Sequence, residues 1–434
     1  MKHLLAARLL SAKLMLAAGL MLVMPGMGGA QPVPGGTPQG TPQSTPQRPG
    51  GGNGGGIGGI GLSISLGRKT PRVPELPQLE LRDAVIADHV AGRVLFTLAL
   101  PGARAAAIAR AARVTLIAQT PLDQLGLLMV VAGLAPGDTI AAATLRLRQQ
   151  RGVELVQPDY LFQSLGSNSR SKGFKLHGIA DLGRTPVSGT IAMIDTAVDL
   201  GHPGLNGAAI RQTGFGPAAV PSAHGTAIAE LLVGRGDFAG TAPGAQLVSL
   251  AAFSPAGEAS WLSQTSYLAG AMNEALRLRP NVLNLSFGRS GNDPLLGRAL
   301  DRMQQTGICV VAAAGNGSGA PVLFPAAHPA SLAVTAVDAR LRAYRYASMG
   351  SQISVAAWGV ALSAAVPGGR RSVSGTSFAT AVVAGALLRT PECSTVRNPA
   401  AMKARMMAQA KDLGAPGPDP VFGAGLFKLA AQKK

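Results

Sequence analysis

The chain contains little charge and few aromatic residues, which limits the partners that it can recognise. Charged residues make up 14% of its 434 residues and aromatic residues 4%, although the formal net charge is +18. A basic chain suits negatively charged partners in general. Here the basic residues are mostly scattered arginines without a long Lys/Arg run, and few rings are available to stack on bases. We therefore expect no nucleic-acid partner.

Cysteine and clustered acidic residues are scarce as well. The only cysteines are Cys309 and Cys393, which lack the four-ligand spacing of a zinc site. They allow one disulfide at most, and a disulfide needs an oxidising compartment. No carboxylate cluster resembles a calcium loop. We therefore expect no required cofactor and place no metal site.

A hydrophobic run long enough to span a membrane is missing at the N-terminus. The run Leu14–Met24 is shorter than the roughly 20 residues that a spanning helix needs. Basic residues precede it, and the small residues Gly28-Gly29-Ala30 follow it, which is the order of a secretory signal peptide. We expect residues 1–30 to be removed and the product to be secreted or periplasmic, without stable membrane insertion. An uncleaved anchor is the alternative.

The rest of the chain divides by composition and periodicity. Residues 31–79 form a Gly/Pro-rich linker that cannot bury enough apolar surface to fold. Residues 80–165 alternate as β-α-β-β-α-β, the order of a ferredoxin-like α+β domain. The polar stretch Ser164–Phe174 is typical of a linker and of a cleavage site. Within residues 166–434, short apolar strands alternate with helical patterns, which predicts a three-layer α/β domain around a parallel sheet.

Three polar side chains follow strands or begin helices in this last region. Asp195 ends the apolar strand TIAMI, His224 precedes the helical pattern AIAELLVG, and Ser377 precedes the apolar helix FATAVVAGALL. Each alone is more typical of a cap or a polar surface residue. Together they supply a nucleophile, a base and a carboxylate in the order Asp, His, Ser, which is one of the known orders of the catalytic triad. Asn316 follows another buried strand and can donate to an oxyanion, worth roughly 3–4 kcal/mol.

The segments around these residues resemble the subtilase family, the subtilisin-like serine peptidases. The resemblance covers residues 185 to 428 and is carried by the stretches IAMIDTAVDLGHPGL, HGTAIAELLVG, GTAPGAQLVSLAAF, VLNLSFG, VVAAAGNGS and SGTSFATAVVAG. It implies that Ser377 is the nucleophile, His224 the general base and Asp195 its orienting partner. Asn316 would form the oxyanion hole with the backbone N–H of Ser377. Protein or peptide substrates would bind as an added strand.

The resemblance also assigns roles outside the triad. Ser286, Phe287 and Gly288 align with the edge segment that pairs with the substrate backbone. The end of residues 80–165, VELVQPDYLF, resembles the last strand of inhibitor-type propeptides, so this domain would be an intramolecular chaperone and inhibitor. Self-cleavage is then expected between about Phe162 and Leu176. Structural calcium is common in the family, but the resemblance places no calcium site here.

Four positions depart from the usual family pattern. Ala197 stands where glycine usually follows Asp-Thr, Ala227 replaces a second histidine, and Ala381-Val382 replace Pro-His. None removes a triad atom, so we expect an active secreted endopeptidase. The alternative is a catalytically silent binding or regulatory module on the same fold.

The two cysteines are expected near the face opposite these polar residues. Cys309 begins the strand that leads to Asn316, and Cys393 follows the helix that begins at Ser377. Both a disulfide and a pair of buried free thiols remain consistent with this placement.

Overall fold

The computed structural model describes residues 88–102, 104–165, 167–169, 185–217, 219–235, 239–256 and 260–429. All of them belong to one structural unit, Leu81–Lys434. The expected signal peptide and Gly/Pro-rich linker lie outside the described residues. No helix in the described part of the chain is long and apolar enough to cross a membrane.

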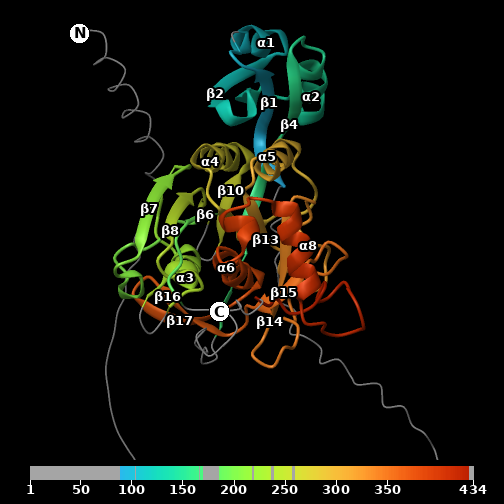
Figure 1. Ribbon diagram of the computed structural model, residues 1–434. Helices are drawn as coiled ribbons and strands as arrows, with labels where there is room; N and C mark the ends of the chain where they lie inside the picture. The colour runs from blue at the N-terminus through green and yellow to red at the C-terminus, as the bar shows by residue number, and fades with distance from the viewer. Residues whose placement is uncertain are drawn as a thin grey trace, which may run out of the picture. The chain divides into compact units, whose positions relative to one another are not determined.

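The first described elements form a small α+β domain (Figure 1). In chain order they are β1 (His89–Ala99), α1 (Ala105–Ala111), β2 (Val114–Leu122), the 3-10 turn η1 (Asp123–Leu125), β3 (Leu127–Leu134), α2 (Ile140–Arg148) and β4 (Val153–Ser164). The strands pair antiparallel in the order β2-β3-β1-β4. This is the ferredoxin-like arrangement that the sequence predicts.

Alternation along β1 explains how this domain uses both faces of its sheet. Val94, Phe96 and Leu98 are buried in a core that they share with α1 and α2. Leu95 points to the other face, where it joins a core that includes residues of α4 (Thr265–Leu278) and α5 (Pro294–Gln305). The small domain therefore packs its open sheet face onto helices of the larger domain.

The larger domain is built around a seven-stranded sheet. Its strands are β6 (Thr190–Asp195), β7 (Ala209–Gly214), β8 (Gln246–Ala251), β11 (Val282–Leu285), β13 (Cys309–Ala313), β14 (Ser331–Val337) and β15 (Val355–Trp358). They run parallel in the order β15-β14-β13-β11-β6-β8-β7. The remaining helices are α3 (Ala223–Val233), α6 (Thr376–Leu387), α7 (Pro391–Ser394) and α8 (Pro399–Gln409). The predicted fold class is confirmed.

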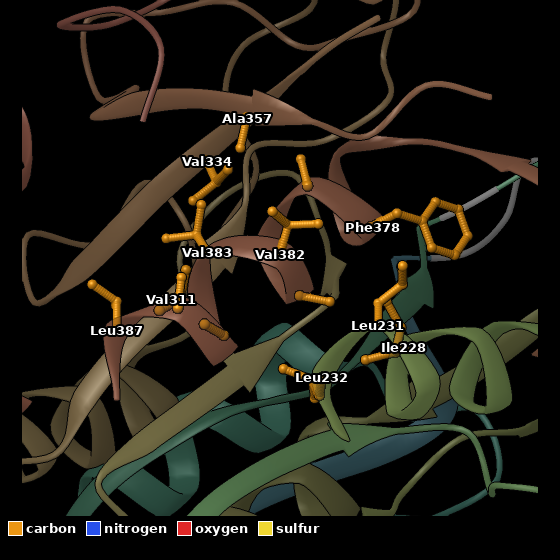
Figure 2. Close-up of a cluster of buried hydrophobic side chains, with 14 of the residues drawn as sticks. Ile228, Leu231, Leu232, Val311, Val334, Ala357, Phe378, Val382, Val383 and Leu387 are labelled. Carbon is orange, nitrogen blue, oxygen red and sulfur yellow. The ribbon is translucent and has the colours of Figure 1, made fainter. Parts of the chain in front are cut away.

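Helices cover both faces of this sheet, because its strands are apolar on both sides. On β6, Ile191 and Met193 join one core, whereas Ala192 and Ile194 join the opposite core with α4 and α5. Figure 2 shows part of the first core, in which side chains of α3 and α6 meet the sheet. The labelled residues are Ile228, Leu231, Leu232, Val311, Val334, Ala357, Phe378, Val382, Val383 and Leu387.

The strand order also determines where functional groups gather. From β6 the chain proceeds to β7 and β8 on one side of the sheet and then to β11 on the other side. The carboxyl end of β6 therefore lies at a topological switch point, where open α/β sheets place their ligands.

Short elements complete the described structure. They are β5 (Ser167–Ser169), the 3-10 turn η4 (Pro203–Leu205), β9 (Ser254–Pro255), β10 (Trp261–Gln264), β12 (Phe287–Gly288), β16 (Leu362–Val366) and β17 (Gly369–Ser374). The sequence predicts a linker over Ser164–Phe174, but β5 lies within it and pairs antiparallel with β17. Its hydrogen-bond partner is distant in sequence, so local composition does not reveal it.

The two cysteines form a disulfide. Cys309, the first residue of β13, is bonded to Cys393 in α7, with 84 residues of sequence separation. Of the two alternatives left open by the sequence, the structure has the disulfide.

Candidate active site

Asp195 lies at the carboxyl end of β6 and is 2% exposed. Its Oδ1 accepts hydrogen bonds from the backbone N–H of Thr196 at 2.7 Å and from the Thr196 hydroxyl at 3.1 Å. It also accepts from Nδ1 of His224 at 2.7 Å. A buried carboxylate is stable only when it is paired in this way. Asp195 is therefore placed to fix the orientation of the imidazole.

His224 is the second residue of α3, and a glycine allows the helix to approach β6. Ser222 caps the helix by accepting from the His224 N–H at 3.2 Å. The Gly225 N–H donates to the Thr196 hydroxyl at 2.9 Å. A Cβ atom at Gly225 would collide with the carbonyl oxygen of Thr196. The glycine after His224 thus lets the start of the helix lie against the end of the strand.

Ser377 is fully buried in the first turn of α6. Its hydroxyl donates to the carbonyl oxygen of Ser286 at 3.1 Å rather than to His224. The Ser286 hydroxyl in turn donates to the Ser377 carbonyl at 3.2 Å. Backbone N–H groups in the first helical turn have no acceptor within their helix, so the Ser377 N–H is suited to bind an oxyanion.

Asn316 follows β13 and contacts the residue before Ser377. Its Oδ1 accepts from both the backbone N–H and the hydroxyl of Thr376, each at 3.1 Å. The Thr376 hydroxyl also accepts from the Gly315 N–H at 3.2 Å. Because the amide oxygen of Asn316 is engaged, the amide nitrogen is the group of this side chain that can donate to a substrate.

The end of β4 lies between two strands of the larger domain. On one side Phe287 and Gly288 of β12 pair antiparallel with Ser164 and Gln163. On the other side β10 pairs antiparallel with residues 161–163. The N–H of Leu165 donates to the Ser286 carbonyl at 3.2 Å. This segment therefore occupies the position of an added strand, with edge partners on both sides.

Strand β10 also pairs with the end of β4, and the sequence did not reveal this strand. Its four residues, Trp261–Gln264, are too few to show a strand period, and its partner lies about a hundred residues earlier in the chain. Of the residues that the family resemblance assigns to the substrate edge, Phe287 and Gly288 pair with residues 161–165, the inserted segment, and the Ser286 carbonyl accepts from the Leu165 N–H. Their role in binding substrates stays a prediction.

The carbonyl of Leu165 contacts His224. Nε2 of His224 lies 2.9 Å from this oxygen, and since a carbonyl only accepts, the ring nitrogen donates. Burial alone would lower the pKa of His224, but the charge and hydrogen bond of Asp195 and the Leu165 carbonyl together raise the pKa above 6.5. With both ring nitrogens donating, this arrangement holds the imidazolium form, which cannot accept a proton from Ser377.

Apolar side chains anchor the inserted segment. Phe162 is fully buried, and its ring centre lies 5.8 Å from that of Phe287 and 6.4 Å from that of Phe324. Leu165 is 8% exposed. A Cβ atom at Gly288 would come within 3.2 Å of Leu165 and closer still to Leu323, so glycine is needed for this approach.

Two buried carboxylates join the small domain to the helices beneath it. Asp159 accepts from the N–H and the hydroxyl of Ser266, each at 3.0 Å, near the start of α4. Asp293 caps α5 by accepting from the Leu296 N–H, and it also accepts from Gln157 of β4 at 3.0 Å. Burial raises the pKa of both carboxyl groups.

The four residues that depart from the family pattern are all buried in the larger domain. Ala197 is fully buried and does not have a positive φ, so it needs no glycine. Ala227, Ala381 and Val382 are fully buried in the core around α3 and α6.

His202 is a structural turn residue that caps η4 and contacts the Gly369 carbonyl at 2.7 Å. No group of three or more metal-ligating side chains occurs among the described residues.

Comparison with known proteins gives the family. The pattern of the subtilase family matches residues 188–425, which is more than half of the chain. The chain therefore belongs to the subtilase family, and it is a serine endopeptidase by class.

Curated relatives are similar over the same region. Subtilisin NAT of Bacillus subtilis subsp. natto is 31% identical over 268 residues, which cover 57% of this chain and 68% of that protein. Subtilisin of Bacillus pumilus is 32% identical over 207 residues, covering 45% of this chain and 74% of that protein.

Solved structures extend the similarity to the fold. Fervidolysin from Fervidobacterium pennivorans, described as a keratinolytic enzyme related to subtilisin, aligns with a TM-score of 0.67 and 22% identity. The alignment covers 80% of this chain and 61% of fervidolysin, and at this identity it supports the fold alone. An S218A mutant of the protease domain of PatA aligns with a TM-score of 0.50 and 27% identity, covering 56% of this chain and 94% of that domain.

Proposed function

We propose that this chain is an exported, self-processing serine endopeptidase in which Asp195, His224 and Ser377 form the catalytic triad. The observation that carries this proposal is the position of Leu165. Its carbonyl contacts Nε2 of His224, while its N–H is bound by Ser286. The carbonyl of an extended segment thus lies beside the proposed base, and Ser377 is bound to the same Ser286 carbonyl that holds this segment.

The proposed reaction starts with two local rotations. The Leu165 carbonyl turns from His224 toward the amide nitrogen of Asn316 and the N–H of Ser377. The Ser377 hydroxyl turns from Ser286 toward Nε2 of His224. With the Leu165 carbonyl turned away, His224 releases its Nε2 proton to water and becomes neutral. It then takes the hydroxyl proton as Ser377 attacks the carbonyl carbon, and it gives that proton to the leaving amine. Water, deprotonated by the same imidazole, then hydrolyses the acyl-enzyme and restores the Ser377 hydroxyl. Asp195 stabilises the imidazolium, and the two donors stabilise the oxyanion.

The bond that is cut during maturation is proposed to be the one after Leu165. Antiparallel pairing to β10 and β12 extends through residues 161–164 and ends beside the proposed base. This position falls within the interval expected from the sequence, between about Phe162 and Leu176. Residues 80–165 would then inhibit the enzyme until they dissociate or are degraded, because Phe162 and Leu165 are buried where substrate residues would bind.

Substrates of the mature enzyme would bind as β4 does. Backbone pairing on both sides requires an extended segment, which favours unfolded proteins and exposed loops. The burial of Leu165 and Phe162 favours an apolar residue before the cut bond and an aromatic residue three positions earlier. Export is supported by the Cys309–Cys393 disulfide, since disulfides persist in oxidising compartments.

A quenched fluorescent peptide with the sequence Phe-Gln-Ser-Leu before the cut position tests the proposal. The processed protein should cleave it after Leu, and a serine-reactive organophosphate should block the reaction by attaching to Ser377. Ser377→Ala should have no turnover and no label. Turnover that persists in Ser377→Ala would exclude this residue as the nucleophile, and binding without turnover by the wild type would favour the silent module.

A further inference from the structure

Arg289 directly follows the edge segment Ser286–Gly288, and its backbone is firmly placed. Its N–H donates to the Phe324 carbonyl at 3.0 Å, and its carbonyl accepts from the Phe324 N–H at 3.0 Å. Nη1 donates to the Asn292 carbonyl at 2.9 Å. These contacts lie within the larger domain, so they do not depend on the small domain being present.

The guanidinium group faces residues of the small domain. It lies 4.0 Å from the ring centre of Tyr160 and 5.9 Å from that of Phe162. Nη2 is 3.6 Å from a carboxylate oxygen of Asp88, whose side chain is 66% exposed. The Arg289 side chain is only 8% exposed, and its buried Nε has no hydrogen-bond partner among the described residues. Most of what covers this cation would therefore leave with the small domain.

The register of β4 places this contact relative to the proposed cut. Counting back from Leu165, Phe162 is the fourth residue and Tyr160 the sixth. Alternate residues of a strand share a face, so Tyr160 and Phe162 both point toward the larger domain. The distance of 4.0 Å between the guanidinium carbon and the ring centre is typical of a cation stacked on an aromatic face.

We propose that Arg289 forms an additional substrate subsite, which binds an aromatic side chain at the sixth residue before the scissile bond. The inference rests on the proposed function, because it requires that substrates take the path of β4. Tyr160 occupies the subsite in this structure. The planar guanidinium selects a flat ring, whereas the exposed Asp88 carboxylate is screened by solvent and contributes less.

The test uses quenched fluorescent peptides and the enzyme that self-processing of the full chain yields. One peptide carries Tyr-Leu-Phe-Gln-Ser-Leu before the cut position, and two others replace its Tyr with Ala or Asp. A fourth peptide, Phe-Gln-Ser-Leu, ends at the fourth position and has no residue at the sixth. For the wild type, kcat/KM should be roughly 5- to 30-fold higher with Tyr than with Ala.

Variants assign this preference to Arg289. The Tyr-to-Ala ratio should fall below about twofold in Arg289→Gln. The same fall in the Tyr-to-Ala ratio is expected in Arg289→Lys, which keeps the charge without the planar group. This variant tests the subsite if Arg289→Gln does not fold. Arg302→Gln, on the exposed face of α5, should keep the wild-type ratio.

The outcomes separate the subsite from the proposed function. Equal rates with Tyr and Ala in the wild type would overturn the subsite, as would a ratio that survives in both Arg289 variants. A preference for Asp over Tyr would also overturn it, because charge would then be recognised instead of a ring. If no peptide is cleaved, including the short one, the proposed function itself fails.

Discussion

The disulfide between Cys309 and Cys393 should be a major source of stability. It closes a loop of 84 residues, for which the chain-entropy relation gives about 4–5 kcal/mol near 25 °C. Both cysteines are fully buried. The bond joins the start of β13, which leads to Asn316, to the helix that follows α6. It therefore ties the strand before Asn316 to the segment that follows Ser377 and the rest of α6.

The perturbation is the paired change Cys309→Ala and Cys393→Ala, made together with Ser377→Ala to prevent self-digestion. Urea unfolding followed by circular dichroism gives the free energy of unfolding by linear extrapolation. We expect it to fall by about 4–5 kcal/mol relative to the Ser377→Ala parent. A reducing agent should produce a similar loss in the parent and none in the paired variant. A loss below about 1 kcal/mol would refute the reasoning.

Three further predictions follow from buried charges. Asp195→Asn removes two contributions that raise the pKa of His224, so its NMR titration in the Ser377→Ala background should move to lower pH; with Ser377 intact, kcat should fall on the order of 10⁴-fold. Glu230→Gln leaves the Arg370 guanidinium without the carboxylate that two of its nitrogens contact at 2.6 and 2.9 Å, and the free energy of unfolding should fall by about 3 kcal/mol in urea titrations. Burial raises the pKa of Asp159 above 3.8, so the protonated carboxyl group stabilises the folded state below that pH, and this contribution is lost as the pH rises through the raised pKa. Between about pH 4 and about pH 7, Asp159→Asn should therefore lose less stability than the unsubstituted chain. Thermal unfolding in the Ser377→Ala background measures the difference.

Much of the fold follows from local patterns. The apolar run TIAMI lies in β6, and the β-α-β-β-α-β order of the small domain is visible in its alternation. Asp195 and His224 were singled out because each ends a strand or begins a helix. The structure brings their side chains to 2.7 Å, although their catalytic roles stay a prediction.

The features that the sequence did not reveal depend on contacts between distant segments. Leu165 meets His224 across 59 residues, and Glu230 meets Arg370 across 140. The sequence around a charged residue in a helical pattern does not indicate which distant residue it pairs with in the fold. Arg289 likewise looks like one more scattered arginine, and only the pairing of β4 with β12 brings Tyr160 over it.

The most direct test of the central claim is the intact mass of the exported product. The full chain and its Ser377→Ala variant are expressed into an oxidising compartment and compared. We predict that the parent yields a mature fragment beginning directly after Leu165, while the variant retains residues 80–165 in one chain with the rest. If both proteins retained residues 80–165, self-processing by Ser377 would be contradicted. Cleavage after Leu165 in the Ser377→Ala variant, purified without other peptidases, would contradict it as well.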